Sequence, residues 1–305
     1  MRAILFPGQG SQYVGMASDF YEKFDLVKKV FDKVDKTLNY PLSNLILNGP
    51  EDELKLTQNT QPAIMTIGVS IFNVLNEHFK LNLNEAKFFA GHSLGEYTAL
   101  VCAGSLTVER AAYLLRERGK AMQESVPEGQ GSMTAVLGMK IDEVEKEINL
   151  LPKEEICEIA NDNCSGQIVV SGTRIANEIL NKNLKKKRKR GIVLPVSAPF
   201  HCSLMKTASE KMNDKINHTN FLKPKPSIIS NVTAKEENEI NSIKTLLIKQ
   251  ITSRVRWRES VDYMIKNGVS DFTEIGPGKV LSGLVKKINK EVKISSINSV
   301  EDINR

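Results

Sequence analysis

The spacing of apolar residues predicts strands that alternate with helices along most of the chain. Short apolar runs predict buried strands over residues 2–6, 87–91, 227–232, 271–275 and 292–297. Apolar positions at helical spacing predict helices over residues 16–38, 60–79, 96–103, 107–122, 201–218, 243–251, 257–267 and 280–289. Because strands that alternate with helices form sheets covered on both faces, we expect a largely parallel sheet of the α/β class.

The middle of the chain has a different order of elements. After a break at residues 127–131, the pattern predicts strand, helix, strand, strand, helix and strand, over residues 132–139, 142–151, 156–161, 167–172, 176–187 and 192–197. This βαββαβ order is that of a ferredoxin-like unit. We therefore expect a large α/β-hydrolase-like catalytic domain of residues 1–129 and 196–305, interrupted by a small ferredoxin-like subdomain of residues 130–195.

The second predicted strand ends in a motif that is typical of a catalytic serine. Gly91-His92-Ser93-Leu94-Gly95 is a G-x-S-x-G sequence between a strand and a helix. The two glycines allow a sharp turn that exposes the Ser93 hydroxyl at the start of the helix, where free N–H groups lie. We infer that Ser93 is a nucleophile and that the Leu94 N–H is one oxyanion donor. The loop Gly8-Gln9-Gly10 is the candidate for the second donor, although it also fits a plain strand-to-helix turn.

A serine nucleophile needs a base, and the histidines are few. The chain has four, His78, His92, His201 and His218. His78 and His218 are expected at exposed helix ends, and the His92 side chain should point away from that of its neighbour Ser93. His201 follows a predicted strand and comes after the serine, as in α/β-hydrolases, so it is the expected base. No acid stands out as its orienting partner; the choice between Asp262, Asp271 and Glu274 stays open.

Composition narrows the classes of function. No apolar run is long enough to cross a membrane, and Met1–Gly8 is too short an apolar run for a signal peptide, so a cytoplasmic protein is expected. The four cysteines form no C-x-x-C pair and we expect them to be reduced; with four histidines, a metal site is not expected. A net charge of +6 favours an acidic partner. Nucleic acid is one alternative, but aromatic residues are scarce and no nucleic-acid-binding motif is present.

Six motifs, in this order, resemble those of malonyl-CoA:acyl carrier protein transacylases. They are Phe6–Gln12, Gly91–Tyr97, Arg118–Met122, Asn161–Gly172, Ser197–His201 and Glu274–Gly278. The similarity extends from the first predicted strand to the last. It implies that Ser93 takes the malonyl group from coenzyme A, with His201 as base, and passes it to the phosphopantetheine thiol of acyl carrier protein for fatty acid synthesis. Coenzyme A is then part of the substrate and product, and no cofactor is expected.

The resemblance also assigns roles that the residue pattern alone does not. It implies oxyanion donors at the backbone of Gln9 and Leu94, and a main-chain carbonyl of Gln250 that orients His201 in place of an acid. It implies that Arg118, which helical spacing alone would treat as a solvated charge, pairs with the malonyl carboxylate through a two-pronged hydrogen bond. Three further positions match the acyl pocket of the family: Gln61, Asn161 and Phe200.

The expected partners follow from the same resemblance. Acyl carrier protein is acidic, so a basic tract on the inserted subdomain is a candidate steering surface, although a plain solvated helix end and loop explains the tract somewhat better. The tract consists of Lys182, Lys185, Lys186, Lys187, Arg188, Lys189 and Arg190. A monomer is expected, without membrane or nucleic acid. The main alternative is a serine hydrolase or thioesterase, which needs the same elbow but no arginine for a carboxylate.

Overall fold

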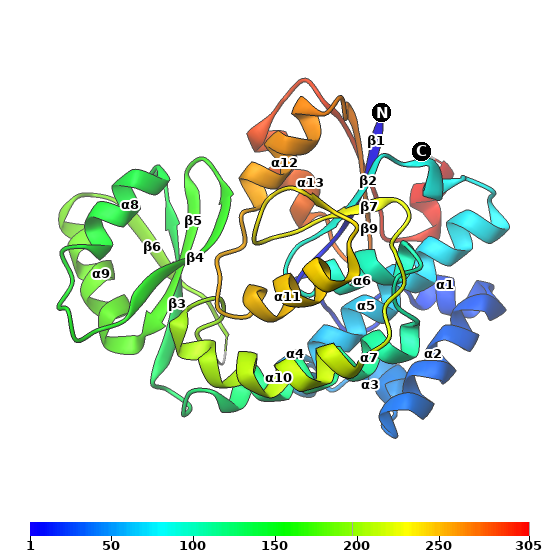
Figure 1. Ribbon diagram of the computed structural model, residues 1–305, viewed down its shortest axis with the longest axis horizontal. Coiled ribbons are helices and arrows are strands. Elements are labelled where there is room, and N and C mark those ends of the chain that lie inside the picture. The colour runs from blue at the N-terminus through cyan, green and yellow to red at the C-terminus, as the bar shows by residue number, and fades with distance from the viewer. Residues whose placement is uncertain (197, 305) are drawn as a thin grey trace.

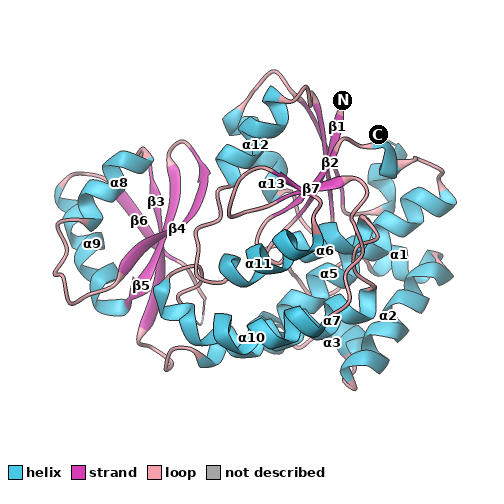
Figure 2. Ribbon diagram, viewed as in Figure 1, coloured by secondary structure: helices cyan, strands magenta, loops and turns pink. Residues whose placement is uncertain are grey.

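The computed structural model describes residues 1–196 and 198–304, and the strands lie in two sheets (Figures 1 and 2). Sheet A has the order β10-β9-β1-β2-β7-β8. The strands are β1 (Arg2–Phe6), β2 (Phe88–Gly91), β7 (Ser227–Ile229), β8 (Glu236–Glu237), β9 (Asp271–Ile275) and β10 (Lys293–Ile297). All neighbours are parallel except β8, which is antiparallel to β7 and was not predicted. The expected α/β fold with a largely parallel sheet is confirmed.

The central strand β1 shows why the predicted strands are continuous apolar runs. Ile4 and Phe6 belong to the core on one face of sheet A, and Ala3 and Leu5 belong to the core on the other. Because successive side chains point to opposite faces, a strand buried on both faces has no polar position to alternate with. The first face packs against α2 (Asp25–Leu38), α5 (Thr57–Asn73), α6 (Gly95–Cys102) and α7 (Val108–Glu124). The second packs against α12 (Trp257–Lys266) and α13 (Val280–Ile288).

Helix boundaries differ from the predictions at several places. The expected helix over 16–38 is two helices, α1 (Ser18–Lys23) and α2, because Phe24 between them has an extended backbone. Helix α5 begins at Thr57, one turn before the expected start, and a π-helical segment (Val74–His78) follows it. Pro62 has no N–H for the Gln58 carbonyl, and the Arg116 guanidinium donates to that carbonyl instead, at 3.3 Å. The helices α3 (Leu42–Asn48) and α4 (Glu51–Lys55) lie between the helices predicted over 16–38 and 60–79, where no element was predicted.

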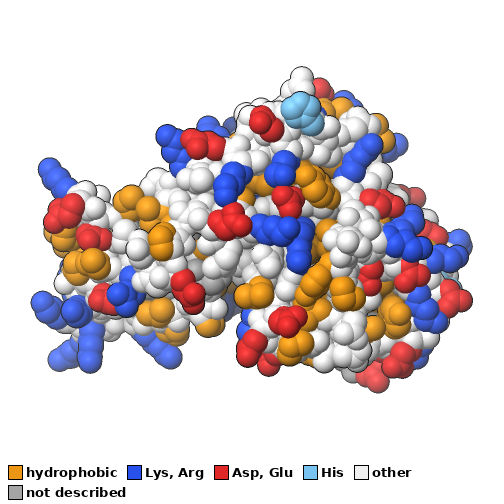
Figure 3. All heavy atoms as spheres, turned by 90° about the horizontal axis from the view of Figure 1, so that it is seen from below, with side chains coloured by type: hydrophobic (Ala, Val, Ile, Leu, Met, Phe, Trp, Pro, Cys, Tyr) orange, Lys and Arg blue, Asp and Glu red, His pale blue; other side chains and the backbone are white. Residues whose placement is uncertain are grey.

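Sheet B is antiparallel and has the order β4-β5-β3-β6. Its elements are β3 (Gly131–Leu137), α8 (Ile141–Ile148), β4 (Cys157–Cys164), β5 (Gln167–Thr173), α9 (Arg174–Lys186) and β6 (Arg190–Val193). This is the predicted βαββαβ order, with a core of its own between the sheet and its two helices. The domain boundaries at residues 129–130 and 195–196 stay predictions. Figure 3 shows lysine and arginine side chains projecting at the end of the molecule that this unit forms.

Two strand ends in sheet B were predicted wrongly. Strand β4 continues to Cys164, beyond the predicted end at residue 161, because two register shifts keep Asp162 and Cys164 paired with β5. Strand β6 ends at Val193, not at 197, and Ser197 lies outside the described residues.

The end of β4 is hydrogen-bonded to the segment at the start of α12. Val255 donates its N–H to the Ala160 carbonyl at 2.7 Å and accepts the Asp162 N–H at 3.0 Å. The Arg258 guanidinium, at the start of α12, donates to both carboxylate oxygens of the buried Asp162, with Nη2 to Oδ2 at 2.8 Å. These contacts place the residue between them, Asn161, beside the carboxyl ends of the parallel strands.

The segment that follows sheet B is less helical than expected. A 3₁₀ turn (Ser203–Met205) precedes α10 (Lys206–His218), so His201 lies in a loop with φ +60° and not in a helix. Helix α11 (Ile240–Gln250) begins three residues before the predicted start. Short 3₁₀ turns at Leu83–Glu85 and Val300–Asn304 complete the described elements. Within residues 1–196 and 198–304, no helix is both long and apolar enough to cross a membrane.

Candidate active site

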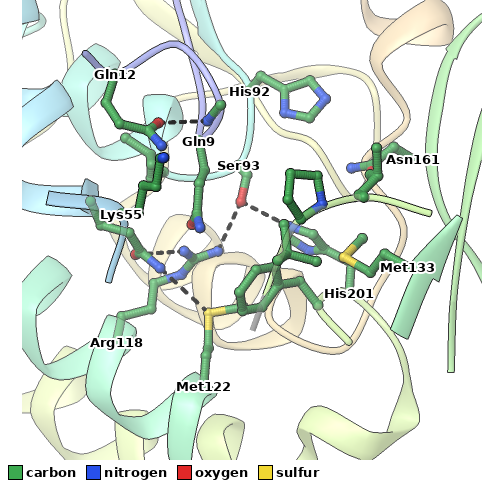
Figure 4. Close-up of a pocket in the computed structure, with 17 residues that line it drawn as sticks. Gln9, Gln12, Lys55, His92, Ser93, Arg118, Met122, Met133, Asn161 and His201 are labelled. Carbon is green, nitrogen blue, oxygen red and sulfur yellow. Dashed lines mark hydrogen bonds between the residues drawn. The ribbon is translucent and has the colours of Figure 1, made fainter. Parts of the chain in front are cut away.

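The turn after β2 has the geometry of a nucleophile elbow. Ser93 has φ +54°, in the left-handed region that residues with a Cβ rarely adopt. A Cβ on Gly91 would lie 1.9 Å from the Gly95 carbonyl, and one on Gly95 would lie 2.3 Å from the Phe6 carbonyl oxygen. Both glycines of G-x-S-x-G are therefore required by close packing of backbone on backbone. The turn directs Ser93 into a cavity of about 470 Å³ between the two sheets (Figure 4).

Ser93 and His201 form a hydrogen-bonded pair. Ser93 Oγ lies 2.8 Å from His201 Nε2, and His201 Nδ1 lies 2.8 Å from the main-chain carbonyl oxygen of Gln250. That carbonyl is at the C-terminal end of α11, where carbonyls lack a helical partner. Since a carbonyl only accepts, Nδ1 carries the proton and Nε2 is the acceptor for the serine hydroxyl. Burial, followed by the Arg118 charge, lowers the pKa of His201 to about 3, so the imidazole is neutral and available as a base.

The three acids considered as partners of His201 make other contacts. Asp262 pairs with Arg258 at 3.3 Å, and Asp271 pairs with Arg2 at 3.2 Å on the surface. Glu274 accepts the N–H groups of Leu281 and Ser282 at the start of α13. The group that His201 Nδ1 contacts in this structure is the Gln250 carbonyl.

Arg118, on α7, is the buried cation of the site. Its side chain is not a solvated helix charge: the residue is 1% exposed. Nη1 donates to Gln61 Oε1 at 2.7 Å, and Nη2 donates to Ser93 Oγ at 3.1 Å (Figure 4). Nη2 also donates to Gln250 Oε1 at 2.9 Å. Among the described residues, its Nε–H has no hydrogen-bond partner. The pKa of Arg118 is lowered by burial, so the desolvation of this charge is already part of the folded structure.

The remaining predicted residues also line the cavity. Gln9, Gln61, Leu94, Asn161 and Phe200 all line it, and Figure 4 shows Asn161 on the His201 side and Gln9 near Ser93. A Cβ on Gly8 would lie 2.7 Å from the His92 carbonyl oxygen, so the loop before Gln9 packs directly on the elbow. Leu94 is the N-cap of α6, and its N–H therefore has no acceptor within the helix. The site thus brings together the residues that the resemblance assigned to it, while their catalytic roles stay predictions.

The sequence interpretation missed the residues behind the elbow. Asn231, in the loop after β7, accepts the Ser93 N–H through Oδ1 at 2.7 Å. Glu96, buried on α6, accepts the Asn231 N–H at 3.0 Å and a Gln250 Nε2–H at 2.8 Å. Burial raises the pKa of Glu96 to about 7. The only available signal for Asn231 was its place at the carboxyl end of a predicted parallel strand, where functional groups gather.

Comparison with known proteins agrees with this geometry. The family model described as acyl transferase domain matches residues 4–304. A protein of Bacillus subtilis (strain 168) named malonyl CoA-acyl carrier protein transacylase is 44% identical over 303 residues, which cover 99% of this chain and 94% of the relative. The chain belongs to this family. It is an acyltransferase, as its resemblance implied.

Solved structures of the transacylase family superpose along the whole chain. The acyl-carrier-protein-S-malonyltransferase from Bartonella henselae is 43% identical, with a TM-score of 0.96 over 99% of this chain and 97% of that one. A malonyl-transacylase solved in complex with a type II PKS acyl-carrier protein is 36% identical, with a TM-score of 0.96 over 99% and 97% of the two chains. Within the part of this chain that the structure describes, no group of three His, Cys, Asp or Glu side chains is arranged to hold a metal ion.

Proposed function

We propose that the protein transfers malonyl from malonyl-CoA to the phosphopantetheine thiol of an acyl carrier protein, through a malonyl-Ser93 intermediate. The observation that carries this proposal is the buried Arg118 guanidinium, 3.1 Å from the nucleophilic oxygen. In a malonyl ester of Ser93, three covalent bonds separate Oγ from the carboxylate carbon. The carboxylate therefore lies within reach of a cation that already contacts Oγ. Nη2 can then donate to the malonyl carboxylate in place of Ser93 Oγ.

In the first step, Ser93 Oγ attacks the thioester carbonyl and His201 Nε2 takes the hydroxyl proton. The backbone N–H groups of Gln9 and Leu94 stabilise the negative oxygen of the tetrahedral intermediate. The intermediate collapses, the C–S bond breaks, and the imidazolium returns its proton to the coenzyme A thiolate. The Gln250 carbonyl holds the imidazole in the required tautomer throughout, although it supplies less charge stabilisation than a carboxylate.

In the second step, the carrier thiol gives its proton to His201 and attacks the malonyl ester of Ser93. The same donors hold the oxyanion, and Ser93 leaves with the proton from His201. The acyl group itself lies between two sides of the cavity: Arg118 and Gln61 on one side and an apolar wall on the other. That wall consists of Met122, Met133, Leu194, Pro195, Val196 and Phe200. We expect Asn161 and Phe200 to limit the size of the group that fits, and the product to supply extender units for fatty acid synthesis.

The basic tract supports docking of an acidic carrier. All seven of its Lys and Arg residues are exposed, from Lys182 to Arg190. Of these, Lys187 pairs with Glu147, and no other ion pair is found for the tract within the described residues. Lys182, Lys185, Lys189 and Arg190 line a surface groove together with Glu178 and Val193, and Leu194, the residue after Val193, lines the active-site cavity. We propose that this groove, at the end of the molecule where Figure 3 shows clustered positive charge, steers the carrier toward the cavity.

Mass spectrometry tests the proposal directly. Wild-type protein exposed to malonyl-CoA should carry one malonyl group on the peptide that contains Ser93, and holo acyl carrier protein should remove it. Ser93→Ala should abolish the adduct, whereas Ser209→Ala, a half-buried serine that donates to the Ile248 carbonyl on α11, should retain it. Release of free malonate at the same rate with and without the carrier would favour the hydrolase alternative. A malonyl adduct that persists in Ser93→Ala would refute the assignment of Ser93 as the nucleophile.

A further inference from the structure

The elbow is held by a side chain from another part of the fold. The Ser93 N–H donates to Asn231 Oδ1 at 2.7 Å, and Asn231 Nδ2 donates to the Gly91 carbonyl at 2.7 Å. One planar amide thus spans both sides of the turn. It contacts the residue before the turn as a donor and the residue in the left-handed conformation as an acceptor.

Asn231 is itself fixed on every side. The residue is 1% exposed, its N–H donates to Glu96 Oε2 at 3.0 Å, and its carbonyl accepts the Arg256 N–H at 3.0 Å. Gln250 Nε2 approaches the same Oδ1 at 3.4 Å. Gln250 also accepts from His201 through its carbonyl and from Arg118 through Oε1. The amide of Asn231 is therefore linked by hydrogen bonds to Ser93 directly, and to His201 and Arg118 through Gln250.

The chemistry of the two contacts explains why an amide stands here. The Gly91 carbonyl needs a donor and the Ser93 N–H needs an acceptor, and a planar amide offers both at once. An ionised carboxylate of the same size offers two acceptors, so it would repel the Gly91 carbonyl. A protonated carboxylic acid again offers one donor and one acceptor.

We propose that Asn231 is a positioning residue for the nucleophile, an inference that rests on the proposed function of Ser93. It holds the Gly91–Ser93 backbone in the left-handed turn that sets Oγ 2.8 Å from His201 Nε2. By taking the Ser93 N–H, it also fixes the orientation of the turn that leads into Leu94, which lines the cavity. Asn231 acts through Ser93 and does not line the cavity.

The test compares Asn231→Ala and Asn231→Asp with wild type. The readouts are the rate at which a fluorophosphonate labels Ser93, which needs neither malonyl-CoA nor a carrier, and kcat and KM for malonyl transfer. Asn231→Ala should slow labelling and kcat about 100-fold, the typical cost of a misplaced reacting group. KM for malonyl-CoA should change only a few-fold, because Arg118 and Gln61 remain. Asn177→Ala is the matched control, since Asn177 is equally buried but binds the Ser132 and Thr173 carbonyls in the small subdomain. It should label at the wild-type rate.

The aspartate variant gives a signature that a general loss of structure does not. Its labelling rate should rise as pH falls from about 8 to about 5, because protonation of the introduced carboxyl restores the donor to Gly91. The charged and titratable groups near this position are Glu96 on α6, Arg118 on α7, His92 and His201 in their loops, Glu237 on β8 and Arg256 before α12; all are shared with wild type. A pH profile parallel to wild type, or a labelling rate unchanged in Asn231→Ala, would overturn the inference. Wild-type protein that labels with the fluorophosphonate but forms no malonyl adduct would refute the proposed function and leave this inference standing.

Discussion

Replacing Arg118 with methionine tests the origin of acyl selectivity. Methionine keeps much of the apolar stem and removes the charge and the donors, so the substitution leaves Gln61 Oε1 and Gln250 Oε1 without the bonds they accept at 2.7 and 2.9 Å. Those losses affect any acyl donor equally. The malonyl carboxylate is the only part of the substrate that acetyl-CoA lacks. The ratio of kcat/KM for malonyl-CoA to that for acetyl-CoA therefore isolates the pairing of Arg118 with the carboxylate.

The magnitude follows from the burial of the guanidinium. Arg118 is 1% exposed, so the carboxylate meets a cation that has already lost its water. Removal of one partner of a buried, hydrogen-bonded charge pair costs about 2–5 kcal/mol. At about 1.4 kcal/mol per tenfold, the ratio in Arg118→Met should be lower than in wild type by a factor of about 30 to several thousand. Arg118→Lys should lie between wild type and Arg118→Met, because an ammonium keeps the charge but lacks the planar fork.

The assay measures both donors with the same enzyme preparation and the same carrier protein. Arg116→Met is the matched control, two residues away on α7. Arg116 donates to the Asn59 side chain and lies over the Tyr40 ring, 4.4 Å from its centroid, and it does not line the cavity. Its ratio should equal that of wild type. An equal loss with malonyl-CoA and acetyl-CoA in Arg118→Met would refute the carboxylate role.

Three further predictions concern the base, the partner and the fold. Because the pKa of His201 is about 3, against about 6.5 for a free histidine, protonation of His201 should not lower the acylation rate between about pH 6.5 and pH 5. Arg118→Met removes a charge that lowers this pKa, so the pH below which the rate falls should be higher in that variant. A wild-type limb near pH 6.5 would contradict this. Charge reversal of Lys185 and Lys186 to Glu should raise KM for the carrier and leave the rate of Ser93 acylation by malonyl-CoA unchanged. The increase in KM should become smaller as salt increases, and an increase independent of salt would argue against steering. Arg258→Met should lower the free energy of unfolding, measured by urea denaturation, by roughly 3 kcal/mol, because it leaves the buried Asp162 carboxylate unpaired. The control Arg174→Met, which removes the partner of the exposed Glu178, should lower it by less than about 1 kcal/mol.

The sequence by itself determined the features that depend on neighbouring residues. The apolar runs predicted the parallel strands because a strand segment buried on both faces is mostly apolar, as residues 3–6 of β1 are. The two glycines of the elbow could also be recognised, since their requirement is set within a few residues. The choice of His201 followed from the small number of histidines and from strand order.

Only the tertiary structure decided the features that join distant segments. Helical spacing alone treated Arg118 as a surface charge, and it took the family resemblance to place it in the site; its burial comes from α5, α7 and α11, with contacts 57 and 132 residues away. Asn231 meets Ser93 across 138 residues, and no local pattern marks it. The elbow can be recognised from five consecutive residues because steric demands on backbone are local. The polar network that holds it could not be, because hydrogen bonds between elements depend on how the sheet and helices pack.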